Sequence, residues 1–365
     1  MIRAVLVDDE PPARVRMRQL LDAAGGVIVV GEAGSAVEAR DLIRDTRPDL
    51  LFLDVEMPEV RGTALAASLP EPRPFIVFAT AFESYALDAI AVDATDYLLK
   101  PVSRAKLAAT LDRVRARLAR QSDLERDVAA ASAVQVQMWP GALPQIAGFD
   151  CAAASLPARG VGGDFYDAFA IGDATWAFLL GDASGKGMAA GLVASAVQAR
   201  VNSAARFARF APEALMASVD RDVYATTDGA RYATAIYASL DAHTRALTIV
   251  NAGHPPVMVF DPGGATITRV HSTGPALGLI DAGVFASQTL TLPHGGVLVA
   301  YTDGVCEARD AQDEEFGDER LATMLTDGRR RSAAELCAGI LDAVRAHRGA
   351  RQDQDDVTAL VVKAS

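Results

Sequence analysis

The sequence of 365 residues contains only three cysteines, Cys151, Cys306 and Cys337, and they are widely spaced. An odd number of scattered cysteines does not build a disulfide framework and is typical of a reducing cytosol. No run of about 18 apolar residues is present to span a bilayer, and the first residues lead directly into a strand rather than a signal peptide. We therefore expect a soluble cytoplasmic protein that does not enter a membrane.

Basic residues are in the minority, because 35 lysines and arginines face 47 aspartates and glutamates, for a net charge of −12. Nucleic acid is therefore not expected as a partner, since its phosphates require a basic surface. Residues 101–140 alone carry an excess of basic side chains, which marks them as a separate element. With half of its residues hydrophobic, a chain of this length suits about two domains with proper cores.

The first hundred residues alternate between strand and helix patterns. Each of several apolar strands ends on a polar side chain, and these side chains are Asp8, Asp9, Asp54, Thr80 and Lys100. Five strands alternating with helices predict a doubly wound parallel sheet of the flavodoxin-like type. The carboxyl ends of such strands share one edge, where ligands bind, so we expect these side chains to lie together.

The motifs VDDE, LDVEMP, AT and DYLLKP, taken as a set, resemble a bacterial response-regulator receiver domain over residues 1–120. The resemblance implies that Asp54 is the phosphoacceptor, charged by a sensor histidine kinase or a small phosphodonor. It implies one Mg²⁺ held by Asp8, Asp9, Asp54 and the backbone carbonyl of Glu56. It also implies three switch residues: Thr80 bonds the new phosphate, Lys100 pairs with it, and Tyr97 turns inward.

Simpler interpretations exist for single members of this set. An isolated pair such as Asp8 and Asp9 more often caps a helix, and a lone lysine at a strand end is usually solvated. The joint placement of all of them on one sheet edge favours the phosphoacceptor site.

Residues 104–140 form a helical connector that overlaps the last receiver helix. Its apolar residues Leu107, Leu111, Val114 and Leu118 recur at helical spacing, and neither proline nor glycine interrupts the stretch between Ser103 and Pro140. This seam can pack on its own receiver or form a short parallel coiled coil with a second copy. Because the helix is longer than a receiver needs, we expect a homodimer.

Residues 141–365 contain four acidic motifs beside apolar runs, and their carboxylates are Asp164, Asp182, Asp303 and Asp355. Burying a carboxylate is costly unless a positive charge meets it. Oxygen ligands without histidine or cysteine suit Mg²⁺ or Mn²⁺. Strands are expected at 150–155, 165–171, 176–180, 233–239, 246–251, 257–261, 296–301 and 357–363. With long helices between them, they predict an α+β sandwich of two antiparallel sheets flanked by helices.

The motifs VGGDFYD, GDASGKG, NAGHPP, GPALGL, YTDGVCEA and DDVTALVVK resemble the PPM (PP2C-like) serine/threonine phosphatases of the SpoIIE/RsbU branch. The resemblance covers residues 141–365 and implies two Mn²⁺ or Mg²⁺ ions that activate a bridging water. Asp182 and Asp164 are the expected catalytic residues. Asp182 would bridge both ions, Asp164 and the Ala183 carbonyl would complete one, and Asp303 and Asp355 the other. Asp356 is the less certain ligand and is expected behind Asp355.

Two further residues of this half have open roles. His254 could donate a proton to the leaving serine oxygen, but a structural hydrogen-bonding role is favoured. Lys186 could assist phosphate binding or could be solvated.

Together the two resemblances imply a two-component response regulator whose output is dephosphorylation of a phosphoserine or phosphothreonine protein. In this branch the substrate is usually a STAS-domain anti-sigma-factor antagonist, which regulates a sigma factor by partner switching. Phosphorylation of Asp54 would control the output. The alternative is a non-catalytic adaptor that binds a sigma factor or anti-sigma component in a phosphorylation-dependent way. Such adaptors have lost metal ligands, whereas all the acidic positions are present here.

Overall fold

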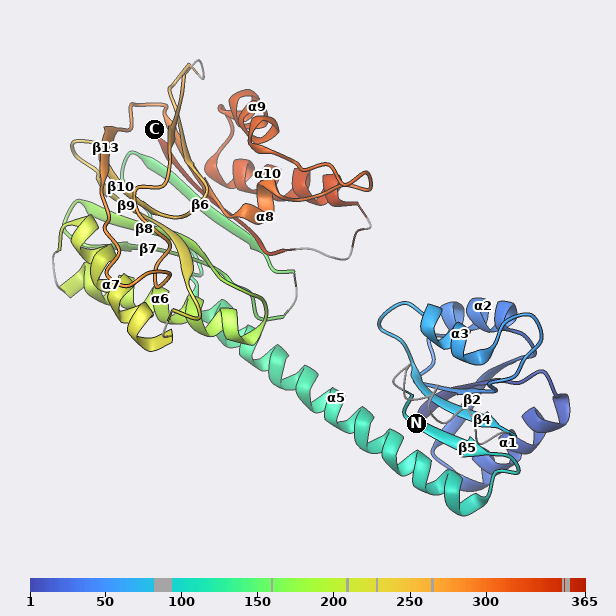
Figure 1. The fold of residues 1–365 in the computed structure, drawn as a ribbon. Helices are drawn as coiled ribbons and strands as arrows, with labels where there is room; N and C mark the ends of the chain where they lie inside the picture. The colour runs from blue at the N-terminus through green and yellow to red at the C-terminus, as the bar shows by residue number, and fades with distance from the viewer. Residues whose placement is uncertain are drawn as a thin grey trace. The chain divides into compact units, whose positions relative to one another are not determined.

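The computed structural model describes residues 1–81, 94–158, 160–207, 210–227, 229–263, 266–349, 351 and 355–365. The chain divides into two compact units, Met1–Glu125 and Arg126–Ser365 (Figure 1). Among the described residues, no helix combines the length and the apolar character needed to cross a bilayer.

The first unit is built on a five-stranded parallel sheet with the strand order β2-β1-β3-β4-β5. Its described elements are β1 (Ile2–Val7), α1 (Pro11–Ala24), β2 (Val27–Ala33), α2 (Ala36–Thr46), β3 (Leu50–Leu53), α3 (Gly62–Ser68), β4 (Phe75–Thr80), β5 (Asp96–Leu99) and the beginning of α5 (Arg104–Met138). Every residue of β3 is buried, which explains its unbroken apolar run. The expected doubly wound sheet is confirmed.

Helices cover both faces of this sheet. One core cluster joins the sheet to α1 and α5, and a second joins it to α2 and α3. Leu107, Leu111 and Val114 belong to the first cluster and are fully buried. The apolar seam of the connector therefore packs on the unit from which it emerges. Beyond that seam Leu124 is 63% exposed.

The second unit is a sandwich of two five-stranded antiparallel sheets, as expected. One sheet has the order β13-β10-β9-β8-β7 and the other β12-β11-β14-β15-β6. The strands are β6 (Phe149–Leu156), β7 (Asp164–Ala170), β8 (Thr175–Ala183), β9 (Ala233–Asp241), β10 (Ala246–Ala252), β11 (Val257–Phe260), β12 (Ile267–Val270), β13 (Gln288–Thr291), β14 (Val297–Tyr301) and β15 (Val357–Ala364).

Three core clusters hold the sandwich together. One cluster fills the space between the two sheets. A second lies under α6 (Met188–Phe207) and α7 (Pro212–Thr227), which cover the first sheet (Figure 1). A third lies under α8 (Asp303–Cys306), α9 (Asp318–Gly328) and α10 (Ala333–Arg348), which cover the second.

Antiparallel pairing places the acidic motifs at one end of this sandwich. β7 begins at Asp164 and β8 ends at Ala183, so the beginning of one strand lies beside the end of its neighbour. In the other sheet β14 ends at Tyr301 and β15 begins at Val357, and these two strands also pair. In each sheet the acidic loops therefore lie at the end of an antiparallel strand pair, where one strand begins and its neighbour ends.

Candidate active site and phosphoacceptor site

Three carboxylates meet at the carboxyl ends of β1 and β3. The strands are parallel, and Val7 pairs with Leu53, so the residues that follow them, Asp8 and Asp54, are neighbours. Asp8, Asp9 and Asp54 each present an oxygen, and these oxygens lie within 4.8 Å of one another. Carboxylates in this arrangement suit Mg²⁺, which takes one or two of them and keeps several waters.

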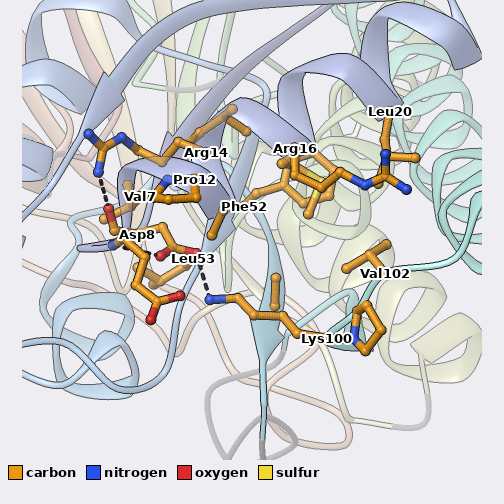
Figure 2. A pocket seen from close by; sticks show the side chains of 16 residues that line it. Val7, Asp8, Pro12, Arg14, Arg16, Leu20, Phe52, Leu53, Lys100 and Val102 are labelled. Atoms are coloured by element: carbon orange, nitrogen blue, oxygen red, sulfur yellow. Dashed lines mark hydrogen bonds and ion pairs between the residues drawn. The ribbon is translucent and has the colours of Figure 1, made fainter.

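Lys100 reaches into this cluster from the end of β5. Its Nζ lies 2.7 Å from Asp8 Oδ2 (Figure 2). The same Nζ lies 2.6 Å from Asp54 Oδ2. Burial lowers the pKa of Lys100, but hydrogen bonds to Asp54 and Asp8 outweigh it and leave the pKa raised. Burial raises the pKa of Asp54, and Lys100 opposes that rise only in part. Lys100 is therefore positively charged at neutral pH and lies beside Asp54, the expected phosphoacceptor.

Thr80 lies at the end of β4, the strand next to β3. Its hydroxyl is buried and has no hydrogen-bond partner among the described residues. A buried hydroxyl without a partner costs free energy, and a phosphoryl oxygen on Asp54 would supply one. The backbone N–H of Glu56 donates to Asp54 Oδ1 at 3.3 Å, and Tyr97 lies half-buried on β5. Asp8, Asp9, Asp54, Thr80 and Lys100 thus lie at the carboxyl-end edge of the sheet, Glu56 lies in the loop after β3, and Tyr97 lies within β5.

In the second unit the first two expected ligands face each other across a strand pair. Asp164 pairs with Asp182 in the register of β7 and β8. A Cβ on Gly163 would lie 2.6 Å from Asp182 Oδ1 and 2.7 Å from the Ala183 carbonyl oxygen. Only glycine therefore lets the backbone come this close to both groups.

Asp164 is buried and is oriented by two hydroxyl groups. Its Oδ2 accepts hydrogen bonds from Thr302 at 2.8 Å and from Thr358 at 2.6 Å. Burial, followed by the charge of Asp182, raises the pKa of Asp164 well above its usual value. The two threonines belong to the motifs YTDG and DDVT but were not singled out from the sequence, where nothing distinguishes their hydroxyls from ordinary strand residues.

Asp182 lies at the centre of the acidic group. Burial raises its pKa to about 8, and the charges of Asp303, Asp355 and Asp356 add to the rise. The same effects act on Asp303, whose pKa is raised by burial and then by the charges of Glu307 and Asp355. Carboxylates that destabilise one another's charged forms in this way favour a divalent cation between them.

These carboxylates are spread more widely than those of the first unit. Within the described parts of the chain, only the cluster of the first unit forms a group of three within 4.8 Å. A pair of ions roughly 3.5–4 Å apart distributes its ligands over two centres and does not need one tight trio. Asp355 is the most exposed of the four expected ligands, and its Oδ2 lies 3.4 Å from the Nζ of the exposed Lys186.

Asp356 uses both of its oxygens on the backbone of the loop before β7. Oδ1 accepts from the N–H of Ala158 at 2.7 Å, and Oδ2 accepts from the N–H of Gly163 at 2.8 Å. With its acceptors engaged in this way, Asp356 fixes the loop that carries Asp164. This geometry supports its expected place behind Asp355 rather than against a metal ion.

Two residues that were not predicted from the sequence, Arg348 and Gln135, hydrogen-bond to the backbone of loops next to the expected ligands. The buried guanidinium of Arg348 donates to the carbonyl oxygens of Asp355 at 2.9 Å and Gly304 at 2.7 Å, and so joins two ligand loops. The buried amide of Gln135, near the end of α5, donates to Gly162 O at 2.7 Å and accepts from Gly162 N at 3.0 Å. Neither residue belongs to an acidic motif, so the sequence carried no signal for them.

His254 is buried and uses both ring nitrogens. Nε2 lies 3.0 Å from the Tyr301 carbonyl oxygen, which can only accept, so Nε2 carries the proton and Nδ1 accepts from the Thr234 hydroxyl at 2.7 Å. Burial lowers the pKa of His254 to about 3. A neutral histidine with both nitrogens occupied supports the structural role over the proton donor.

Comparison with known proteins identifies relatives of both halves. Residues 172–365 match the family model of stage II sporulation protein E (SpoIIE), and residues 4–112 match that of the response regulator receiver domain. The transcriptional regulatory protein BtsR of Salmonella typhi is 46% identical over 122 residues, which are 33% of this chain and 51% of the relative. BtsR of Escherichia coli is 45% identical over the same shares. The chain thus spans about half the length of the curated relatives it matches.

Solved structures resemble the second half. The SiaA-PP2C domain of Pseudomonas aeruginosa has a TM-score of 0.60 at 20% identity and covers 68% of this chain and 99% of that one. The RsbU and RsbW domains of Rv1364c from Mycobacterium tuberculosis have a TM-score of 0.53 at 28% identity, with coverage of 61% and 62%. The first likeness, below 25% identity, shows the fold alone.

Proposed function

This chain belongs to the SpoIIE family and pairs a PPM-type serine/threonine phosphatase domain with a response-regulator receiver, and we propose that its output is the metal-dependent dephosphorylation of a STAS-domain protein under the control of Asp54. The observation that carries the catalytic part is the pairing of the buried Asp164 with the half-buried Asp182, both with raised pKa, at the end of the sandwich.

The residues present fit a pair of divalent cations. All the acidic groups are oxygen donors. The charge of Asp182 adds to the raised pKa of Asp164, and the charges of Asp303, Asp355 and Asp356 add to that of Asp182. Asp164, Asp182, Asp303, Asp355 and the Ala183 carbonyl would hold two Mn²⁺ or Mg²⁺ ions. When bound, such ions neutralise a phosphate ester and supply a hydroxide-like water at neutral pH.

The protein's own contribution is to orient these ligands. Thr302 and Thr358 fix one oxygen of Asp164, so that its other oxygen remains for the cation side. Asp356 and Arg348 hold the loops around the site through backbone groups, without placing a protein nucleophile there. Preorganised ligands avoid the cost of reorganisation during the reaction.

The catalytic proposal is tested with Asp182→Asn. With Mn²⁺, the unaltered protein should hydrolyse p-nitrophenyl phosphate and a serine-phosphorylated STAS-domain protein, and the variant should lose at least a thousandfold in kcat on both. Asp173→Asn, which changes an exposed aspartate in the turn between β7 and β8, is the matched control. Full activity of Asp182→Asn would contradict the catalytic role of Asp182, and an unaltered protein that hydrolyses neither substrate would favour the adaptor.

The regulatory part of the proposal concerns the receiver and α5. Phosphoryl transfer to Asp54, with Mg²⁺ on Asp8, Asp9 and the Glu56 carbonyl, would rearrange Thr80, Lys100 and Tyr97. Helix α5 begins in the receiver core, and near its other end Gln135 is hydrogen-bonded to Gly162, two residues before Asp164. A shift of α5 would therefore be felt directly by a ligand loop.

We also propose a homodimer formed through the connector. Four large apolar side chains of α5 are exposed: Leu124, Val134, Val136 and Met138. Exposed apolar positions on a helix favour pairing with a second helix. Light scattering should give twice the chain mass for the unaltered protein, and the monomer mass for Leu124→Glu combined with Val136→Glu. A monomeric parent protein would contradict the dimer.

A further inference from the structure

A loop between β12 and β13, residues 277–284, exposes three large apolar side chains. Leu279, Ile280 and Val284 have exposed fractions of 44%, 49% and 83%. The loop contains the end of the motif GPALGL, which the catalytic site does not use. Exposed apolar side chains that lie together on a surface often mark a site of interaction with another molecule, whereas singly scattered ones do not.

The loop is held in shape by one buried carboxylate. Asp220 of α7 is completely buried, and its two oxygens accept from the backbone N–H groups of Gly278 and Gly283, each at 2.8 Å. A Cβ on Gly278 would lie 2.4 Å from Val223 Cγ1, and its φ is +79°, so glycine is required at this end. A loop fixed at both ends presents its apolar tip without a large ordering cost on binding.

The loop starts beside the catalytic strands. Leu277 and Ala233 exchange two backbone hydrogen bonds, of 2.8 and 2.9 Å. Ala233 in turn pairs with Ala183, the residue after Asp182. Two strand spacings, about 10 Å, therefore separate the beginning of the loop from the ligand strand. A protein whose phosphorylated residue enters the site must place its neighbouring surface near this loop.

We propose that the 277–284 loop is the docking surface for the phosphoprotein substrate and that it contacts an apolar patch next to the phosphorylated serine or threonine. The inference rests on the proposed phosphatase function. The catalytic site itself is acidic and would recognise the phosphate through bound cations, so it offers little to distinguish one phosphoprotein from another. Side chains that stand out from the surface suit a macromolecule, because small ligands bind in concave sites.

The test compares two substrates that differ in whether they can reach the loop. One probe is a serine-phosphorylated STAS-domain protein, and the other is p-nitrophenyl phosphate, both with Mn²⁺. For Leu279→Ser combined with Ile280→Ser, the ratio of kcat/KM for the protein to kcat/KM for the small ester should fall at least tenfold, mainly through KM, since truncating buried interface anchors has effects of about this size.

Ile28→Ser on β2 is the matched control, because Ile28 has the same side chain and an exposed fraction of 48%. Its ratio should stay within twofold. Val284→Ser is a second, single-site variant in case the double variant does not fold, which circular dichroism would show; its ratio should fall at least threefold.

An unaltered ratio in folded loop variants overturns the docking proposal and leaves the phosphatase function standing. A ratio that stays constant while light scattering shows a change from dimer to monomer makes the loop a self-association surface and also overturns it. If the unaltered protein hydrolyses neither probe, the phosphatase proposal itself fails, and the docking proposal falls with it.

Discussion

The buried carboxylates of the phosphatase domain are held by neutral donors. Hydroxyl groups bond Asp164, and backbone N–H groups bond Asp356 and Asp220. Donors of this kind orient a carboxylate without cancelling its charge. In the receiver, by contrast, Lys100 pairs directly with Asp54. Aspartates are therefore held by neutral donors in one unit, whereas Asp54 in the other unit is held by a cation.

His254 provides a pH-dependent prediction at this scale. Its folded pKa of about 3 lies below the ordinary value of 6.5, so the unfolded chain takes up the proton first. Above pH 6.5, neutral His254 makes its full contribution to the free energy of unfolding. Between pH 6.5 and pH 3 this contribution declines by about 1.4 kcal/mol per pH unit. His254→Gln should lack this part of the decline. From pH 6.5 to 4.5 its free energy of unfolding should therefore fall by about 2 kcal/mol less than that of the unaltered protein.

Urea denaturation at a series of pH values measures this difference. The raised pKa values of Asp164 and Asp182 act in the opposite direction, but they are present in both proteins and cancel in the comparison. His294→Gln, which changes an exposed histidine, should keep the original slope. Equal slopes in His254→Gln and the unaltered protein would contradict a buried neutral histidine.

Arg348 should act through the two ligand loops that it joins. In Arg348→Met the carbonyl groups of Gly304 and Asp355 lose their buried donors, at a cost of about 1–3 kcal/mol each. We expect the dissociation constant for Mn²⁺, measured by calorimetry, to rise at least tenfold, with partial recovery in Arg348→Lys. Arg345→Met, on the exposed face of the same helix, should bind Mn²⁺ normally. Normal Mn²⁺ binding by Arg348→Met would mean that this arginine contributes only to the stability of the fold.

Helix α5 is the element that belongs to both units. Its first turns are part of the receiver core, and its last turns bond to the loop before Asp164 through Gln135 and through Ser132, whose hydroxyl donates to Gly160 O at 2.8 Å. The helix is 35 residues long and has no glycine or proline to break it. Mechanical continuity of this kind is what a connector needs to pass on a displacement.

Gln135→Ala tests the end of this connector. The change leaves both polar groups of Gly162 without their partner, so the loop that carries Asp164 should lose its fixed position. We expect kcat/KM for p-nitrophenyl phosphate to fall by a factor of ten to a hundred. Gln137→Ala, two residues further on at an exposed position, serves as the control. A fully active Gln135→Ala would mean that α5 does not support the site.

The sequence pattern predicts the strands that bury apolar runs but does not predict the short strands that lack such runs. The strands β12 and β13 were not expected, because they lie at sheet edges, are four residues long and expose much of their surface. The aspartates at strand ends were found because an acidic residue after an apolar run is conspicuous. Thr302, Thr358, Gln135 and Arg348 were missed because their roles depend on which loop faces them, and only the fold supplies that.

At the scale of the whole molecule, the proposal is that the receiver controls the reaction of the other unit. The measurable quantity is the ratio of phosphatase rates with and without acetyl phosphate. In the unaltered protein this ratio should differ from one by at least threefold, and in Asp54→Asn it should equal one, because the variant cannot take up the phosphoryl group. Asp45→Asn, an exposed aspartate of α2, should respond like the parent. A response that persists in Asp54→Asn would disprove control through this residue.

The place of β15 in its sheet has a consequence for how the protein is made. β15 spans Val357–Ala364, yet it lies between β14 and β6, the strand with which the phosphatase fold begins. Until β15 has been synthesised, this sheet lacks the strand that joins β14 to β6, and Thr358 is not there to orient Asp164. The receiver needs nothing beyond Glu125 for its core and can fold on the nascent chain. We therefore expect the sensing half to be complete first, and the enzyme to remain inactive until β15 has paired with β14 and β6.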